Sequence, residues 1–257
     1  MTPRLSRIYL AVAAAAVALA APAAASAHAD PPALSLEQAA GTSPAAIQSA
    51  VDAYRADLGN LNPNTPGSVG SGRREINWDG VPDAFAAPNN LPPDFFNHNS
   101  PRGAVFNTPG RAVQVSANAG VAPIEFDNLN PTYSSLFRTF SPQRLFTAVG
   151  SNKVSVRFFV PGSTTPATTR GFGAVFTDVD RPGTKIVYYN ARGRRLAKFD
   201  VPVSPGNETL SFLGVRFKHA RVAEVRITSG TAIPGQSERH GRDAVVMDDF
   251  IYGEPSA

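Results

Sequence analysis

The 257-residue chain contains no cysteine, and this absence narrows what can stabilise it. Without cysteine there is no disulfide framework, no thiolate metal site and no lipobox for lipid attachment. Stability must therefore come from packing, or from an ion held by oxygen ligands. The chain is long enough to pack without such help, since a single β domain often exceeds about 200 residues.

Recognisable catalytic motifs are missing as well. The sequence has no nucleophile elbow, Walker loop, zincin helix or dinucleotide fingerprint. Its four histidines are isolated from one another, without the spacing of metal ligands. The motifs therefore indicate no particular reaction, and the sequence predicts no catalytic residue.

Charge is nearly balanced along the chain. There are 24 Lys and Arg residues against 20 Asp and Glu residues. Loss of Arg4 and Arg7 with an N-terminal signal would leave a formal charge of about +2. This balance predicts no polyanion partner, and therefore no nucleic acid. The densest basic run, residues 192–195, falls where a hairpin turn is expected, which favours a solvated turn over a polyanion site.

The first 29 residues have the pattern of a cleavable Sec-type signal peptide. Arg4 and Arg7 form a basic n-region, and residues 8–21 are apolar but short and rich in alanine. Two small-x-small sites follow, and cleavage at the second would make Asp30 the mature N-terminus. We therefore expect a secreted protein with no membrane span after cleavage.

One helix is predicted at residues 44–58. Ser43 can cap its N-terminus, Pro44 suits the first helical position, and Gly59 can end it. Apolar side chains recur at helical spacing on one face: Ile47, Val51, Tyr54 and Leu58. That face either packs on the rest of the chain or serves a partner. We divide the chain into a signal (1–29), an N-terminal extension with this helix (30–72) and a β domain (73–257).

Residues 60–110 read as a long irregular segment anchored by scattered apolar side chains, and strands follow it. Alternation and turn signals predict strands at 112–117, 144–148, 153–160, 171–179, 185–190, 196–201, 209–217, 222–228 and 244–252. Their short, regular spacing favours antiparallel hairpins. The predicted fold is mainly β, an antiparallel, jelly-roll-like β-sandwich with an N-terminal helix.

Four aspartates in apolar strands are the candidate metal ligands. Alternation places Asp178 and Asp180 on one face, and Asp248 and Asp249 on opposite faces, one of them inward. A charge in an apolar strand needs a partner. Three interpretations stay open: hydrogen bonds or salt bridges, a structural Ca²⁺ bound by Asp178, Asp180 and one of the other pair, or catalytic carboxylates facing one cleft.

Trp78 and Asp79 are the candidate ligand-binding residues. Trp78 is the chain's one tryptophan, and an aromatic ring beside polar groups suits stacking on a sugar. The alternative is that Trp78 belongs to the core.

Four segments together carry a resemblance: Asn-Trp-Asp-Gly-Val-Pro-Asp at 77–83, the glycine-rich strand at 171–180, residues 210–215, and Met-Asp-Asp-Phe at 247–250. They resemble uncharacterised secreted bacterial β-sandwich proteins with cores like those associated with PEP-CTERM proteins. The last strand is similar to the closing strand of jelly-roll carbohydrate-binding modules. The resemblance implies a fold, because sandwiches host unrelated activities. The long segment with aromatic residues and the rim of the sandwich offer a binding site, and no nucleophile, base or catalytic metal constellation can be named. We therefore expect a secreted, non-catalytic domain that binds carbohydrate or another cell-envelope surface. A glycan-active enzyme and a purely structural surface protein are the alternatives.

Overall fold

The computed structural model describes residues 34–257, which belong to one compact unit. The predicted signal peptide at 1–29 lies outside the described residues. Among the residues that are described, no helix has the length and apolar character needed to span a membrane.

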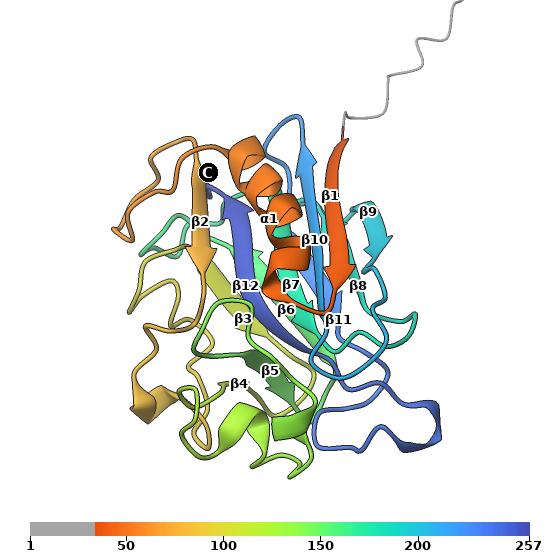
Figure 1. Ribbon diagram of the computed structural model, residues 1–257. Helices are drawn as coiled ribbons and strands as arrows, with labels where there is room; N and C mark the ends of the chain where they lie inside the picture. The colour runs from red at the N-terminus through yellow and green to blue at the C-terminus, as the bar shows by residue number, and fades with distance from the viewer. Residues whose placement is uncertain (1–33) are drawn as a thin grey trace, which may run out of the picture. The chain divides into compact units, whose positions relative to one another are not determined.

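The described chain is a sandwich of two antiparallel sheets (Figure 1), which confirms the predicted fold class. The larger sheet has seven strands: β1 (Leu34–Gly41), β2 (Arg73–Ile76), β4 (Ala112–Val115), β5 (Phe146–Val149), β7 (Gly171–Thr177), β10 (Leu210–Phe217) and β12 (Val246–Gly253). Its order is β1-β10-β7-β12-β5-β4, and β2 pairs with β12 beside β5. Strands that are distant in sequence therefore become neighbours.

The smaller sheet has five strands: β3 (Ala104–Asn107), β6 (Lys153–Phe158), β8 (Lys185–Tyr189), β9 (Arg195–Asp200) and β11 (Glu224–Thr228). Their order is β3-β6-β11-β8-β9. In β6, Val154, Val156 and Phe158 are buried while Lys153 and Arg157 are exposed, as the alternation predicts. One face of this sheet therefore meets the core and the other meets solvent.

Trp78 lies at the centre of the core between the sheets. Its side chain is 1% exposed, and its ring stacks on Phe146 with centroids 4.2 Å apart and planes 4° apart. Phe96 and Phe250 contact the same indole edge-on. The indole Nε1 donates a hydrogen bond to the carbonyl oxygen of Asp248 over 2.9 Å, so the polar group of this buried ring is satisfied.

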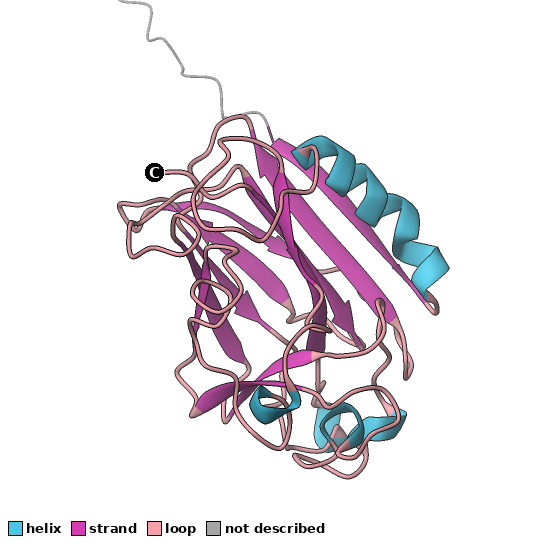
Figure 2. Ribbon diagram, turned by 90° about the vertical axis from the view of Figure 1, so that its left-hand side faces the viewer, coloured by secondary structure: helices cyan, strands magenta, loops and turns pink. Residues whose placement is uncertain are grey.

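Helix α1 (Pro44–Leu58) has the predicted bounds and covers the outer face of the seven-stranded sheet (Figure 2). Its four apolar side chains pack on Val175, Leu210, Phe212 and Ile251. The ring of Tyr54 lies directly over the sheet, where its hydroxyl donates to the carbonyl oxygen of Val215 over 3.0 Å. The helix is therefore docked, not detached. Ser43 has the extended backbone of a cap, but its side chain makes no capping hydrogen bond.

The predicted N-terminal extension (30–72) contributes a strand to the larger sheet. Strand β1, within the supposed extension, pairs along its whole length with β10, from Leu34 opposite Phe217 to Gly41 opposite Leu210. The irregular segment also contains β2 and β3, which the sequence analysis missed. Each of these three strands is short or lies at the edge of its sheet. Such strands show little alternation of polar and apolar residues in the sequence. Four 3-10 turns complete the described chain: η1 (Asp83–Phe85), η2 (Ile124–Phe126), η3 (Tyr133–Ser135) and η4 (Arg239–Gly241).

Candidate functional site

Three carboxylates converge just beyond the end of β7. One oxygen from each of Asp178, Asp180 and Glu238 lies within 4.8 Å of the other two. Asp178 and Asp180 follow β7 directly, whereas Glu238 comes from the loop between β11 and β12. Asp243, from the same loop, accepts a hydrogen bond from the backbone N–H of Asp180 over 3.2 Å. The fold thus gathers four acidic residues at one end of the sandwich.

Asp178 is the buried member of this carboxylate cluster. The residue is 0% exposed, and neither of its carboxylate oxygens has a hydrogen-bond partner among the described residues. One oxygen of Asp243 is buried without a partner in the same way. Buried polar atoms in folded proteins are nearly always paired with protein, water or an ion, so three carboxylate oxygens, two of Asp178 and one of Asp243, still have the capacity to accept a partner. Because carboxylate oxygens accept and do not donate, a cation, a proton shared with Glu238 or a hydrogen-bond donor such as water would satisfy them.

Backbone geometry at Asp178 contributes to this arrangement. Its φ of +69° lies in the left-handed region, which a non-glycine residue rarely occupies. The strand therefore ends at Thr177, and Asp178 and Asp180 converge through a turn and not through strand alternation. The expectation that the two carboxylates meet was right, but the stated reason for it was wrong.

Electrostatics in the cluster favour a neutralising ligand. Burial, followed by the charges of Glu238, Asp180 and Asp243, raises the pKa of Asp178 to about 9. Burial also raises the pKa of Asp243 to about 6. In the described chain, no ion pair involves any of the four acids. The cluster therefore has no salt bridge, but backbone N–H groups donate to Asp180 from Gly206 over 2.6 Å and to Glu238 from Ala244 over 2.9 Å. The three acids Asp178, Asp180 and Glu238 could also hold a metal ion.

Asp248 and Asp249 lie elsewhere, at a β-bulge in β12. Along β7 the register moves from Phe176 to Ala174, while along β12 it moves from Met247 to Phe250. The extra residue falls where the other edge of β12 changes partner from β5 to β2. A bulge disturbs alternation, so both carboxylates reach one hydroxyl and the predicted opposite faces are wrong. Ser141 Oγ lies 2.7 Å from Asp249 and 3.3 Å from Asp248.

These two aspartates are satisfied by protein groups. Asp248 accepts from the backbone N–H of Phe140 over 2.5 Å, and Asp249 pairs with Arg55 over 3.2 Å. Burial and the charge of Asp249 hold the pKa of Asp248 well above its usual range. Neither residue belongs to the cluster around Asp178, so the hypothesis that one of them completes that metal site is wrong. Hydrogen bonds and an ion pair with Arg55 are therefore sufficient to satisfy the buried carboxylates of Asp248 and Asp249.

Asp249 also lines a hollow of about 300 Å³, together with Arg55, Glu75 and Ser141. Asp178 and Asp180 are not among its lining residues. The alternative in which both aspartate pairs face one catalytic cleft is therefore wrong as stated.

Trp78 and Asp79 do not form a surface sugar site. The core position of Trp78 leaves neither face of its ring open to a ligand. Asp79 accepts from the backbone N–H of Gln143 over 2.5 Å and from Asn77 over 2.9 Å. These contacts tie the loop after β2 to the loop before β5, which is a structural role.

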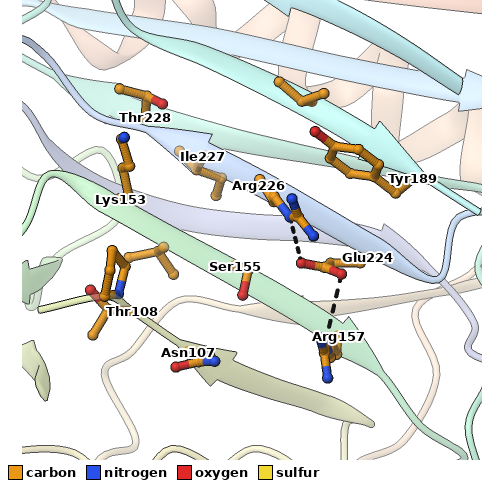
Figure 3. A pocket seen from close by; sticks show the side chains of 13 residues that line it. Asn107, Thr108, Lys153, Ser155, Arg157, Tyr189, Glu224, Arg226, Ile227 and Thr228 are labelled. Carbon is orange, nitrogen blue, oxygen red and sulfur yellow. Dashed lines mark hydrogen bonds and ion pairs between the residues drawn. The ribbon is translucent and has the colours of Figure 1, made fainter. Parts of the chain in front are cut away.

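The sequence analysis did not identify a groove on the solvent face of the five-stranded sheet (Figure 3). It encloses about 540 Å³. Side chains from β3, β6, β8 and β11 line it, among them Asn107, Lys153, Ser155, Arg157, Tyr189, Glu224, Arg226 and Thr228. A second hollow of about 730 Å³ shares Arg157, Glu224 and Arg226 with it, so the two are continuous. We call the pair the sheet groove.

Register explains why sequence reasoning missed these residues. Ser155 faces Arg226 across the β6–β11 ladder, and Arg226 faces Val187 across the β11–β8 ladder. Alternation predicts that Lys153, Ser155 and Arg157 point to solvent, but not which strands flank them. The same holds for Glu238 and Asp243, which lie in a loop without periodicity.

Comparisons with known proteins leave the chain without an assigned family. No family model matches it, and no curated protein matches it. Two variants of CBM29-2, a family 29 carbohydrate binding module, share 14% identity over 42% of this chain and up to 69% of theirs, with a TM-score of 0.25. The enzymatically active domain of tailspike protein 4 from bacteriophage CBA120 shares 14% identity over 63% of this chain and 20% of its own, with a TM-score of 0.28. Scores this low carry no argument about activity, and the relation to PEP-CTERM-associated proteins stays a prediction.

Proposed function

We propose that this protein is a secreted, non-catalytic domain that binds carbohydrate of a cell-envelope or extracellular polymer in the sheet groove. The groove itself carries the proposal. It consists of two continuous hollows on one face of a sheet, and its lining mixes hydroxyl, amide and charged side chains. Sugar hydroxyls need such donors and acceptors, and strands hold them in fixed positions.

The lining of the groove supports binding over catalysis. Glu224 is the one carboxylate side chain among its lining residues, and Arg226 and Arg157 contact it over 2.8 Å and 3.7 Å. Glycoside cleavage ordinarily uses two carboxylates on either side of the bond. The groove offers no such pair.

A polysaccharide panel tests this proposal by measuring retention and release of reducing sugar together. Ser155→Leu places a bulky side chain in the middle of the groove, and we expect it to weaken retention by about tenfold or more. Lys198→Leu is the matched control, because Lys198 lies on β9 of the same sheet but outside the groove lining. Equal retention by both variants, or no retention of any polymer by the native protein, would reject the groove as a carbohydrate site.

A glycan-active enzyme is the second candidate, and one observation favours it. Arg55 Nη2 contacts both Glu75, over 2.9 Å, and Asp249, over 3.2 Å, and both acids line the smaller hollow. Two carboxylates are thus held near each other in one concavity. Release of reducing sugar that disappears in Asp249→Asn, with folding intact, would replace the binding proposal with this one.

The proposal includes a structural Ca²⁺ at Asp178, Asp180, Glu238 and Asp243. Hard oxygen ligands and the unpartnered carboxylate of Asp178 support it. Calcium titration of chelator-treated protein should show saturable binding, and saturating calcium should raise the melting temperature. Asp178→Asn should abolish both effects, whereas Asp200→Asn, which removes an exposed carboxylate, should retain them. Identical melting curves in calcium and chelator would reject the site.

Secretion is the last part of the proposal, and the sequence alone supports it. Mass spectrometry of the protein from culture supernatant should find a mature N-terminus near Asp30. Recovery of full-length chain from the cytoplasm alone would reject it.

A further inference from the structure

The sheet groove concentrates positive charge that the chain as a whole does not show. Its lining carries Lys153, Arg157 and Arg226 against the single carboxylate side chain of Glu224. That carboxylate is already engaged, because both arginines contact it. Lys153 forms no ion pair with any described residue. The hollow of about 540 Å³ therefore holds three cationic side chains against one carboxylate, an excess of about two positive charges.

Arg226 covers the aromatic ring on which a neutral sugar would otherwise stack. Its guanidinium carbon lies 4.4 Å from the ring centroid of Tyr189, over the face of the ring. Its Nε donates to Glu224, and among the described residues no hydrogen bond uses its two terminal nitrogens. Figure 3 shows the guanidinium between Tyr189 and Glu224. A ligand therefore meets a planar cation fixed by a ring and by a carboxylate.

Such a guanidinium is suited to a carboxylate. Two parallel N–H groups match the two oxygens of a carboxylate, and a cation that is already oriented loses less entropy on binding. We infer that the sheet groove recognises an acidic polysaccharide, one that carries uronate carboxylates, through Arg226 with Lys153 and Arg157. This inference rests on the proposed function and names the ligand class of the same groove.

Spacing favours a polymer over a single acidic sugar. Lys153 and Arg157 stand on the same face of β6, four positions apart, which corresponds to about 13 Å along the strand. The second hollow extends the groove beyond Arg157 toward Phe159 and Asn190. Charges at this separation can each meet a carboxylate only if successive sugars lie along the strand.

Nucleic acid is the competing polyanion, and the lining argues against it. Proteins that bind single strands present open aromatic faces on which bases stack. In the groove lining, Tyr189 has one face under Arg226, and the phenylalanine rings come from Phe158, which is buried, and Phe159 at the far end. The open stacking platform that bases need is missing from the described groove.

The experiment compares each of four uronate polymers, polygalacturonate, alginate, hyaluronan and heparosan, with its carboxyl-reduced form by affinity electrophoresis and calorimetry. We expect at least one native polymer to bind about tenfold or more tightly than its reduced form, because charge-assisted hydrogen bonds are lost on reduction. That binding should weaken as NaCl rises from about 50 mM to about 500 mM.

Variants then locate the interaction. Arg226→Gln should weaken binding of the uronate polymer by about tenfold and leave any binding of its reduced form within about twofold. Lys198→Gln is the control, since it removes a cation from the same sheet outside the groove, and it should change neither. Circular dichroism and melting curves check that both variants fold.

The outcomes separate the two proposals. Equal binding of native and reduced polymers would overturn the acidic ligand while leaving carbohydrate binding in place. Binding of neutral polymers alone would do the same. Tighter binding of a single-stranded oligonucleotide than of every uronate polymer would overturn the ligand class in favour of nucleic acid. Retention of no polysaccharide at all would reject both this inference and the proposed function.

Discussion

Asp178 and Glu238 bring carboxylate oxygens within 4.8 Å of each other, although they come from different loops at one end of the sandwich. The carboxylate of Asp178 is wholly buried, and its two oxygens have no hydrogen-bond partner among the described residues. Two acids in this position repel each other unless a proton or a cation lies between them. The free energy of unfolding should therefore depend on both pH and calcium.

The first prediction concerns pH in the absence of calcium. Burial raises the folded-state pKa of Asp178 to about 9, above its ordinary value of 3.8. Protonated Asp178 therefore favours the folded state, and its contribution is complete below about pH 4 and is lost as pH rises through about 9. In chelator, the free energy of unfolding should fall over this range more steeply for the native protein than for Asp178→Asn. Parallel pH profiles from urea denaturation would contradict this.

The second prediction concerns the loop that carries Glu238 and Asp243. A cation bound by these residues and by Asp178 would connect residues 231–243 to the end of β7. Calcium should therefore slow amide hydrogen exchange in this loop, because local opening would require release of the ion. Glu238→Gln should lose that protection, while the exposed substitution Asp200→Asn keeps it. Unchanged exchange in the native protein would show that no ion bridges the two segments.

The third prediction concerns the seat of α1. A Cβ atom at Gly214 would lie 2.7 Å from the ring of Tyr54, which is buried and packed against the sheet. Gly214→Ala should therefore lower the free energy of unfolding by about 1–3 kcal/mol through overpacking. Gly80→Ala is the control, since its Cβ would meet no atom within 4 Å; we expect a change within about 0.5 kcal/mol. Equal losses of unfolding free energy in the two variants would show that α1 can shift away from the sheet without cost.

The fourth prediction concerns the buried pair of Arg74 and Glu254. Arg74 donates to Glu254 from Nε over 2.6 Å and from Nη2 over 2.8 Å, and Arg74 is 0% exposed. Glu254→Gln would leave this guanidinium buried without its counter-charge, so it should cost about 3–5 kcal/mol of unfolding free energy.

The control for this pair is Glu208→Gln, which breaks an exposed contact with Arg138. Surface pairs contribute at most about 1 kcal/mol, so this variant should remain close to the native protein in urea denaturation. A loss no larger for Glu254→Gln than for Glu208→Gln would mean that the buried cation is compensated by the carbonyl oxygens around it.

Local patterns were sufficient for the parts of the fold that depend on local physics. The spacing of Ile47, Val51, Tyr54 and Leu58 predicted helix α1 with its observed bounds. The period of a helix places these four residues on one face, whatever surface that face packs against. Alternation in β6 predicted a strand with one solvent face for the same reason. The antiparallel sandwich follows from many short strands with turn signals between them.

The sequence singled out Asp178, Asp180, Asp248 and Asp249, but only the tertiary structure decided which groups lie beside each of them. Asp178 and Asp180 meet through a left-handed turn and are joined by Glu238, whereas a bulge turns Asp248 and Asp249 toward Ser141 and Arg55. Likewise, Arg226 lies over Tyr189 because β11 pairs with β8. The repeat period and the composition of a segment predict which of its residues share one face of a helix or strand. Register, bulges and loop closure bring distant segments together, and these depend on the packing of the whole core.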